Sequence, residues 1–313
     1  MRKYAIVFDV GGLFIKAGVL DERGRIVPGT YMIYPSRSKE SKEELLGHFV
    51  DLVKQQTNRI LAKAFRIEGI GYAFPGPFDY DRGISYIRDV DKFEAIYGVN
   101  LHDELTHRLA QEGAFAGKRA PDFRIVFEND ANLFALGEYE VGKASRYAKS
   151  ICLTIGTGAG SAFLERGRLV KNRSDVPENG WIYNQPFRDS VVDDYISKRG
   201  IFRLMQQAGL DADVSDVKSA ADLAKAGDER AAAVFRRFGG MIGEMLLPFL
   251  RSFRPEAVVI GGQIVKSQEL FLDSVREAVR DFPVALEVSD ETSLSAFAGV
   301  SRLLREQKNA IRK

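Results

Sequence analysis

Three short apolar runs separated by two turn signals open the chain and restrict the fold that it can adopt. Residues 4–10 are apolar and β-branched, the pair Gly11-Gly12 follows, and a second apolar run covers residues 14–20. This pattern predicts a β-hairpin. A turn at residues 21–24 and a third run at 25–33 extend it to a three-stranded meander. An opening meander disfavours a Rossmann domain, which begins with a β-α-β unit.

The later apolar patterns predict helices alternating with strands in two similar sheets. Helical spacing covers residues 41–64, 130–142, 235–253 and 297–304, and buried strands are predicted at 69–74, 123–127 and 257–260. Residues 150–155 and 161–164 form a predicted hairpin around a glycine-rich turn. No low-complexity linker separates the two halves, so we place the lobe boundary near Pro121, just before a new strand.

Composition describes an ordinary globular chain and excludes several classes of protein. The chain has 313 residues, 45% of them hydrophobic, which is enough for two cores. The net charge is +2 and no Lys/Arg block occurs, so we expect neither nucleic acid nor a membrane surface as partner. Cys152 is the only cysteine, which excludes an intramolecular disulfide and fits a reducing cytoplasm. With no apolar signal region and no bilayer-length apolar stretch, the sequence predicts a cytoplasmic protein.

Three glycine clusters are candidates for binding phosphate, because glycine lets backbone N–H groups approach an anion closely. They are FDVGGLFIKAG at residues 8–18, IGTGAGSAF at 155–163 and VVIGGQIV at 258–265. In the first, Asp9 precedes the turn and is placed to orient a magnesium ion beside phosphates. The third ends a buried strand, where a ribose and base could lie close to backbone. Taken singly, a Gly-Gly pair is more often a simple hairpin turn than a nucleotide loop.

The segment ENDANLFALGE, residues 128–138, places Asp130 at a predicted strand-to-helix junction. The amino terminus of a helix favours negative charge, and side chains there often face a ligand. The alternative is structural, since Asp and Asn are common helix N-caps.

Taken in order, the motifs FDVGG, ENDANLFALGE, IGTGAG and VVIGG resemble the ROK family of sugar kinases, from Tyr4 to about Leu304. The resemblance implies the actin-like ATPase (ribonuclease H-like) α/β fold, with mixed sheets flanked by helices and an interlobe cleft. We expect a small lobe of residues 1–121 joined by the C-terminal helix 292–313, and a large lobe of residues 122–291. The implied activity is ATP- and Mg²⁺-dependent phosphorylation of a sugar hydroxyl, the primary 6-hydroxyl of a hexose, N-acetylhexosamine or glucoside.

The resemblance also assigns roles to residues. Asp130 is implied as the general base, and an aspartate suffices because the transition state of phosphoryl transfer is loose. The residues implied to bind ATP and its phosphates are Asp9, Gly11, Gly12, Lys16, Gly156, Thr157, Gly158, Gly261 and Gly262. Those implied to bind the sugar are Gly76, Lys92, Asn129, Asp130, Glu178, Trp181 and Asp193.

Departures from the family pattern fall mainly where the sugar is expected. Many relatives carry a Glu-x-Gly-His segment followed by three cysteines, but residues 177–181 here read PENGW and no cysteine follows, so we expect no zinc. Glu178 and Asp193 match sugar-binding acids, or they are surface acids, and Asp194 could shift the register of the second. Trp181 could stack on a sugar ring or pack in the core.

Three further positions leave alternatives open. Lys92 replaces a sugar-binding asparagine, so it points to an anionic acceptor if it faces the site and is otherwise a solvated lysine. Leu13 stands where the family has a threonine whose hydroxyl helps hold phosphate, which predicts slower catalysis. Lys16 could serve the active site or a structural salt bridge. His48, His102 and His107 have no metal-ligand spacing.

Two rival functions remain. Part of the ROK family consists of sugar-responsive transcription regulators with an N-terminal DNA-binding domain, for which a first strand at Tyr4 leaves no room. The other rival is a catalytically weak or inactive sugar- or nucleotide-binding sensor, made conceivable by Leu13, Lys92 and Trp181. Relatives are often dimers, so a homodimer is possible.

Overall fold

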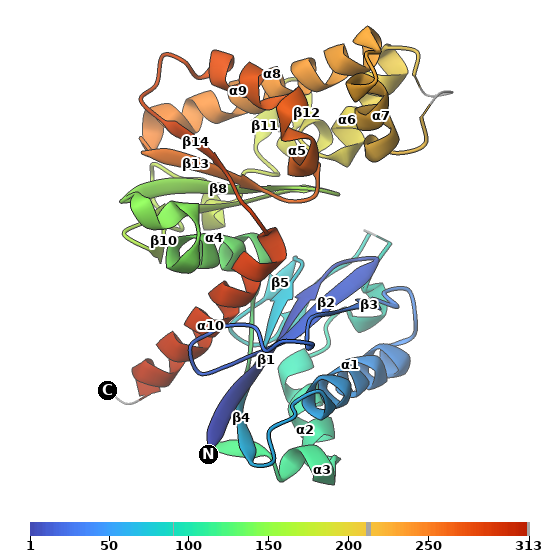
Figure 1. Ribbon diagram of the computed structural model, residues 1–313, viewed down its shortest axis with the longest axis vertical. Coiled ribbons are helices and arrows are strands. Elements are labelled where there is room, and N and C mark those ends of the chain that lie inside the picture. The colour runs from blue at the N-terminus through green and yellow to red at the C-terminus, as the bar shows by residue number, and fades with distance from the viewer. Residues whose placement is uncertain (90, 211–213, 312–313) are drawn as a thin grey trace. The chain divides into compact units, whose positions relative to one another are not determined.

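The computed structural model describes residues 1–89, 91–210 and 214–311 and divides into two compact units. Met1–Gly137 and Ser293–Lys313 make up the first unit, and Glu138–Thr292 the second. Each unit contains one five-stranded sheet (Figure 1). Residues 312 and 313, which the sequence analysis places in the C-terminal helix, lie outside the described residues.

The sheet of the first unit begins with the meander predicted from the sequence. Its strands are β1 (Arg2–Val10), β2 (Phe14–Leu20), β3 (Met32–Pro35), β4 (Phe65–Phe74) and β7 (Arg119–Asn129), in the order β3-β2-β1-β4-β7. β1, β2 and β3 pair antiparallel, and β4 and β7 add to β1 in parallel. Two short strands, β5 (Phe78–Asp79) and β6 (Ile84–Ser85), form a separate hairpin.

The observed sheet differs from the expectations of the sequence analysis at two places. The third strand starts at Met32 instead of residue 25, because Pro28 cannot donate to a ladder and Gly29 turns the chain with a φ of +77°. β7 crosses residue 121, where we had placed the lobe boundary, and pairs with β4 through Ile70 and Ile125. The strand that we assigned to the large lobe therefore belongs to the first sheet.

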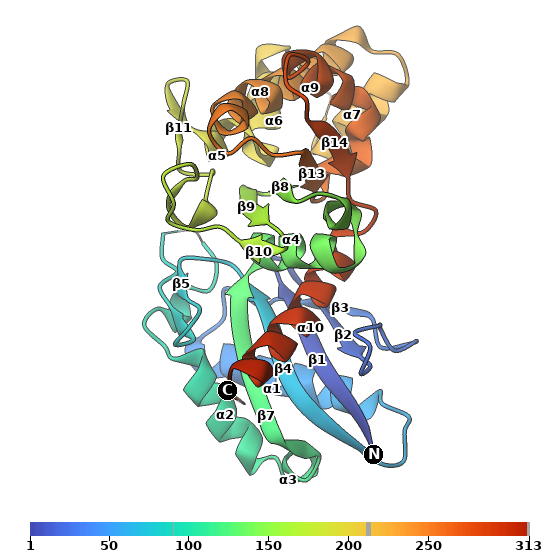
Figure 2. The same ribbon diagram turned by 90° about the vertical axis from the view of Figure 1, so that its left-hand side faces the viewer.

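Helices cover both faces of this sheet. The unit includes α1 (Lys42–Asn58), the short helix η1 (Glu94–Ile96), α2 (Leu101–Gln111), α3 (Gly113–Ala116) and all but the first residue of α10 (Thr292–Ile311). It also includes the first part of α4 (Asp130–Val141), which continues into the second unit after Gly137. A capping box between Ser41 and Glu44 begins α1, which ends before the predicted residue 64. Figure 2 shows α10 on the face of the sheet opposite α1.

The packing of α10 depends on two glycines in β4. A Cβ atom added at Gly71 would lie 2.0 Å from Cγ1 of Val300, and one added at Gly69 would lie 2.6 Å from Cδ2 of Leu304. Such distances are far below van der Waals contact, so only glycine lets the helix lie this close to the strand. The C-terminal helix therefore packs directly on the sheet that the N-terminal strands begin.

The second sheet repeats the directions of the first. Its strands are β8 (Lys149–Ile155), β9 (Ala159–Glu165), β10 (Arg168–Leu169), β13 (Ala257–Gly261) and β14 (Ala285–Val288), in the order β10-β9-β8-β13-β14. β8, β9 and β10 pair antiparallel, while β13 and β14 are parallel to β8. The predicted hairpin around the glycine-rich turn is β8-β9.

The other elements of the second unit are mostly helical. They are η2 (Lys143–Arg146), η3 (Glu178–Gly180), β11 (Pro186–Phe187), β12 (Ser190–Val191), α5 (Val192–Tyr195), α6 (Lys198–Gln207), α7 (Val217–Lys225), α8 (Glu229–Ser252), η4 (Ile264–Leu270) and α9 (Leu272–Ala278). Throughout the part of the chain that the structure describes, no helix combines the length and apolar character needed to span a membrane.

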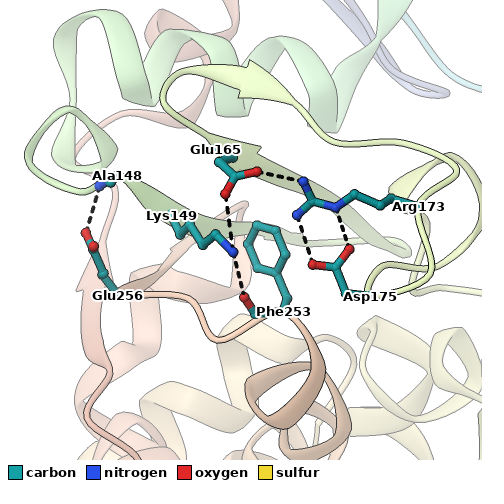
Figure 3. A network of polar contacts seen from close by, with 7 residues as sticks. All are labelled: Ala148, Lys149, Glu165, Arg173, Asp175, Phe253 and Glu256. Carbon is teal, nitrogen blue, oxygen red and sulfur yellow. Dashed lines mark hydrogen bonds and ion pairs between the residues drawn. The ribbon is translucent and has the colours of Figure 1, made fainter.

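A polar network ties the end of α8 to this sheet (Figure 3). Glu165 accepts from Lys149 at 3.2 Å and from Arg173 at 2.6 Å, and these bonds hold the pKa of Glu165 below its ordinary value. Lys149 Nζ also lies 5.1 Å from the ring centre of Phe253, directly after α8. Lys149 is the first residue of β8, and the glycine turn follows the last residue of that strand. The network therefore stabilises the end of the sheet that lies away from the turn.

Candidate functional site

The glycine turn between β1 and β2 uses one of its backbone donors and leaves another open. Gly11 donates its N–H to the carbonyl of Phe14 at 2.9 Å, so that group is occupied by the turn itself. Gly12 accepts at its carbonyl from the hydroxyls of Ser36 and Ser38. Its N–H has no partner among the described residues. Gly12, and not Gly11, is therefore the turn's candidate for an anion.

Asp9 lies directly before this turn, in contact with Lys16 and Ser293. The two charged residues face each other across β1 and β2, with Lys16 Nζ 3.5 Å from Asp9 Oδ2. Ser293 on α10 accepts from Lys16 at 2.6 Å and donates to Asp9 Oδ2 at 3.1 Å. Lys16 thus makes a salt bridge and also lies beside the candidate phosphate turn. Nothing in the sequence pattern marks Ser293, which only tertiary packing brings here.

The junction of β7 and α4 separates the roles of Asn129 and Asp130. Asn129 Oδ1 accepts from the N–H groups of Ala131 and Asn132 at 3.0 and 3.3 Å, so Asn129 provides most of the helix cap. Asp130 Oδ1 accepts from Ala131 at 2.9 Å and makes no ion pair within the described part of the chain. The structural alternative that we kept for this segment therefore fits Asn129 better than Asp130.

Desolvation raises the pKa of Asp130, and the negative charge of nearby Asp9 raises it further. The hydrogen bond from Ala131 and the positive charge of Lys92 act in the opposite direction. Asp130 as a residue nevertheless keeps part of its surface exposed to solvent. Such an acid is suited to accepting a proton.

Gly76, Tyr80 and Asn129 lie together in the same unit. A Cβ atom at Gly76 would lie 3.2 Å from the hydroxyl oxygen of Tyr80, which donates to the carbonyl of Phe74 at 3.0 Å. Asn129 Nδ2 donates to the same hydroxyl oxygen at 3.3 Å. Sequence reasoning missed Tyr80, which follows the Pro-Gly-Pro loop closely in sequence and was detectable from that proximity.

Lys92 reaches the turn at Gly12. A Cβ atom at Gly12 would lie 3.0 Å from Cδ of Lys92, and the side chain of Lys92 is half-buried. Of the two alternatives for Lys92, a fully solvated surface lysine does not fit this placement.

In the second unit, the turn between β8 and β9 again offers open donors. Gly156 donates to the carbonyl of Gly158 at 3.0 Å, while the N–H groups of Thr157 and Gly158 have no partner among residues that the structure describes. Gly261 ends β13, and a Cβ atom at Gly262 would lie 2.2 Å from the carbonyl oxygen of Ile155. The third glycine cluster therefore packs against the base of the second, with Gly262 donating to Thr292 Oγ1 at 2.7 Å.

Asp193 lies on this glycine turn. Its Oδ1 accepts from the N–H of Ala159 at 2.6 Å, and its Oδ2 pairs with Arg199. Lys198 N–H donates to the carbonyl of Gly156 at 2.9 Å, so the segment after Asp193 is docked on the same turn. A carboxylate that we expected to bind sugar is thus engaged with a candidate phosphate-binding turn.

Glu178 is the first residue of η3, and Trp181 directly follows its last residue. Glu178 is exposed, and its carbonyl accepts from Trp181 N–H at 3.0 Å. The indole of Trp181 is half-buried beside Tyr183, with ring centres 6.0 Å apart. Trp181 is therefore not a core residue, and the stacking alternative stays a prediction.

Among the described residues, no group of three or more His, Cys, Asp or Glu side chains could hold a metal ion. His48 contacts the carbonyl of Pro35 at 2.9 Å, and burial lowers its pKa. His102 lies by Asp103 and His107 by Gln111.

Two units that repeat one order of strand directions, each with a glycine turn between antiparallel strands, define the class of actin-like ATPase folds. The chain belongs to the ROK family, whose sequence model matches residues 5–288. Both the family and the fold class predicted from the sequence are confirmed.

Known relatives include enzymes and a regulator. The chain is 26% identical over 296 residues to a glucokinase of Thermotoga maritima, covering 88% of this chain and 86% of that protein. It is 24% identical over 289 residues to a xylose repressor of Bacillus subtilis, covering 88% and 68%. A ROK family glucokinase from Streptomyces griseus, solved with glucose and AMPPNP, superposes with a TM-score of 0.73 at 23% identity, covering 97% and 99%.

Proposed function

We propose that this protein transfers the γ-phosphoryl group of ATP to a hydroxyl group of a sugar, with Asp130 as general base. The observation that carries the proposal is the state of Asp130, an exposed residue whose desolvated carboxyl group has a raised pKa and makes no ion pair with the described residues. The glucokinase from Thermotoga maritima and the Streptomyces griseus enzyme, solved with glucose and an ATP analogue, support the substrate class.

In the proposed reaction, the acceptor oxygen attacks the γ-phosphorus, the bond from that phosphorus to the β,γ-bridging oxygen breaks, and ADP leaves. The hydroxyl proton passes to Asp130. Because the transition state is loose, positioning matters more than basicity. Within the first unit, Asp130 would supply the base and Gly12 would supply a backbone donor to phosphate.

Asp9 is the proposed neighbour of magnesium. Its Oδ2 is occupied by Lys16 and Ser293, whereas its Oδ1 accepts no hydrogen bond from residues that the structure describes. One free carboxylate oxygen fits Mg²⁺, which keeps several waters and takes its other ligands from phosphates. When bound, the ion would neutralise part of the phosphate charge.

The test measures ADP release with a panel of hexoses, N-acetylhexosamines, glucosides and acidic sugars. We expect turnover with at least one acceptor and a loss of roughly 100-fold or more in kcat for Asp130→Asn, as for removal of a general base. Asp51→Asn, on the exposed side of α1, is the matched control and should leave kcat unchanged. An unchanged kcat in Asp130→Asn would rule out this base.

A binding protein without turnover is the second candidate. One observation favours it: Leu13 is 80% exposed beside Gly12 and offers no hydroxyl to phosphate. The related xylose repressor of Bacillus subtilis is a regulator by name. Stabilisation of the protein by sugar or nucleotide in a thermal melt, with no ADP released by any acceptor, would favour this candidate over the kinase.

A further inference from the structure

The loop that carries Lys92 is anchored on both sides of that residue. Asp91 pairs with Lys39. Phe93 has a fully buried ring, and its N–H donates to the carbonyl of Ser38 at 2.6 Å. Ser38 in turn donates to the carbonyl of Gly12 at 2.6 Å. The backbone of Lys92 is therefore held in place beside the glycine turn.

The side chain of Lys92 extends across Gly12. Its Cδ lies 3.0 Å from the position of a Cβ at Gly12, and its Cβ and Cγ lie 3.9 and 4.0 Å from that position. A side chain at Gly12 would crowd the Lys92 stem, so glycine favours this contact. The aliphatic stem of Lys92 therefore lies against Gly12, whose backbone N–H has no partner among the described residues.

The charge of Lys92 has no counter-ion inside the described protein. No carboxylate of the described residues pairs with its ammonium group, whereas neighbouring Lys39 and Lys16 each pair with an aspartate. The charge is nonetheless felt by the carboxylate of Asp130. A half-buried cation whose stem contacts a candidate phosphate turn, and whose charge acts on the candidate base, is suited to an anionic ligand.

We propose that Lys92 is a catalytic residue whose ammonium group stabilises the phosphoryl group while it passes from ATP to the acceptor. This inference rests on the proposed kinase function. During transfer, negative charge is spread over the three non-bridging oxygens of the phosphoryl group. Lys92 stays protonated and donates a hydrogen bond to one of them, while the acceptor proton goes to Asp130 and ADP departs. It would supply the donor that Leu13 lacks.

Steady-state kinetics of Lys92→Met and Lys92→Arg test the proposal with neutral and acidic acceptors. Methionine keeps the length of the stem and removes the charge. We expect Lys92→Met to lower kcat by about 100-fold or more, as for loss of one preorganised donor to a transition state. The loss should be the same for every acceptor, with the KM values for ATP and acceptor little changed. Lys92→Arg should recover part of kcat, and Lys54→Met on α1 is the matched control.

A second readout does not need turnover. Aluminium fluoride added with ADP mimics the phosphoryl group in transfer, and it should raise the melting temperature of the wild-type protein above that with ADP alone. Lys92→Met should lose this additional rise and keep the rise caused by ADP.

The outcomes separate the hypotheses. A loss confined to acidic acceptors, seen as a raised acceptor KM, would overturn the proposal and make Lys92 an acceptor-binding residue. Unchanged kinetics in Lys92→Met would overturn it in favour of a structural lysine. A wild-type protein without turnover on any acceptor would instead overturn the proposed function.

Discussion

Asp130 shows how neighbouring residues change the pKa of a single carboxyl group. Asp9, to which Lys16 and Ser293 are bonded, contributes a negative charge, and Lys92 contributes a positive one. Asn129 takes over the capping of α4, which leaves the carboxylate of Asp130 with one backbone hydrogen bond. Loss of hydration outweighs the stabilising contacts, so the pKa of Asp130 lies above its ordinary value.

Activity should therefore be lost at a higher pH than it would be if the general base were an aspartate with an ordinary pKa. Asp130 accepts a proton only when it is ionised, so kcat/KM should be full above the raised pKa of Asp130 and fall as the pH drops through it. A pH profile of kcat/KM at saturating magnesium measures this acidic limb, that is, the fall of kcat/KM at low pH. The residual activity of Asp130→Asn should lack the limb, and a limb that persists in this variant would assign it to another group.

The same shift in pKa has a consequence for stability. A folded-state pKa above the unfolded value means that the ionised carboxylate of Asp130 costs stability at neutral pH. Asp130→Asn should thus raise the melting temperature at pH 7, and the gain should shrink as the pH falls through the folded-state pKa. Asp51→Asn should show no such pattern. A variant that is less stable than wild type at pH 7 would contradict the direction of the shift.

At the scale of elements, each glycine turn is held by a neighbouring segment. Ser36 and Ser38 hold the carbonyl of Gly12, and Asp193 together with Lys198 holds the turn between β8 and β9. A Cβ atom at Gly158 would lie 2.8 Å from Asp193 Oδ1, so the carboxylate and the turn fit only with glycine there. The turns are therefore preorganised by contacts that lie outside their own motifs.

Removal of the Asp193 carboxylate should loosen the second turn. Asp193→Ala loses a charge-assisted hydrogen bond, and we expect the KM for ATP to rise about tenfold, equivalent to about 1.4 kcal/mol. The acceptor KM and kcat should change little, and Asp193→Asn, which can still accept from Ala159, should show a smaller effect. Asp194→Ala is the adjacent control. A raised acceptor KM would restore the sugar-binding role that the sequence predicted.

At the scale of the whole molecule, the first unit is assembled from both ends of the chain. Gly69 and Gly71 of β4 receive Leu304 and Val300 of α10. α10 also packs on α4, where a Cβ atom at Gly299 would lie 2.0 Å from the carbonyl oxygen of Leu133. The same helix carries Ser293 to Asp9, so the packing of α10 positions part of the candidate site.

Gly71→Ala should destabilise the first unit by about 1–3 kcal/mol, because the added methyl group overlaps Val300. Hydrogen exchange should become faster in β4 and α10 and stay unchanged in β8 and β13. The double variant Gly71→Ala with Val300→Ala should recover part of the loss. Gly47→Ala, in an open position of α1, should instead stabilise slightly. Equal exchange in Gly71→Ala and wild type would show that the helix can move aside.

The sequence by itself determined the opening meander, the α/β class, the family and the order of the glycine turns with ENDAN. These features depend on apolar periodicity and turn residues, which act between neighbours in the chain. The sequence was less accurate for the start of the third strand, which pairs with β2 only from Met32. It was also less accurate for the lobe boundary, because the pairing of β7 with β4 joins segments that are distant in the chain.

Only the tertiary structure decided which polar groups meet. It brought Ser293 to Asp9, laid Lys92 across Gly12, placed Asp193 on the turn at Gly158 and occupied the N–H groups of Gly11 and Gly156. Such contacts join residues far apart in sequence or depend on the conformation of a turn, so no local pattern encodes them. The sequence named the chemical groups, and packing decided which of them remain open to a ligand.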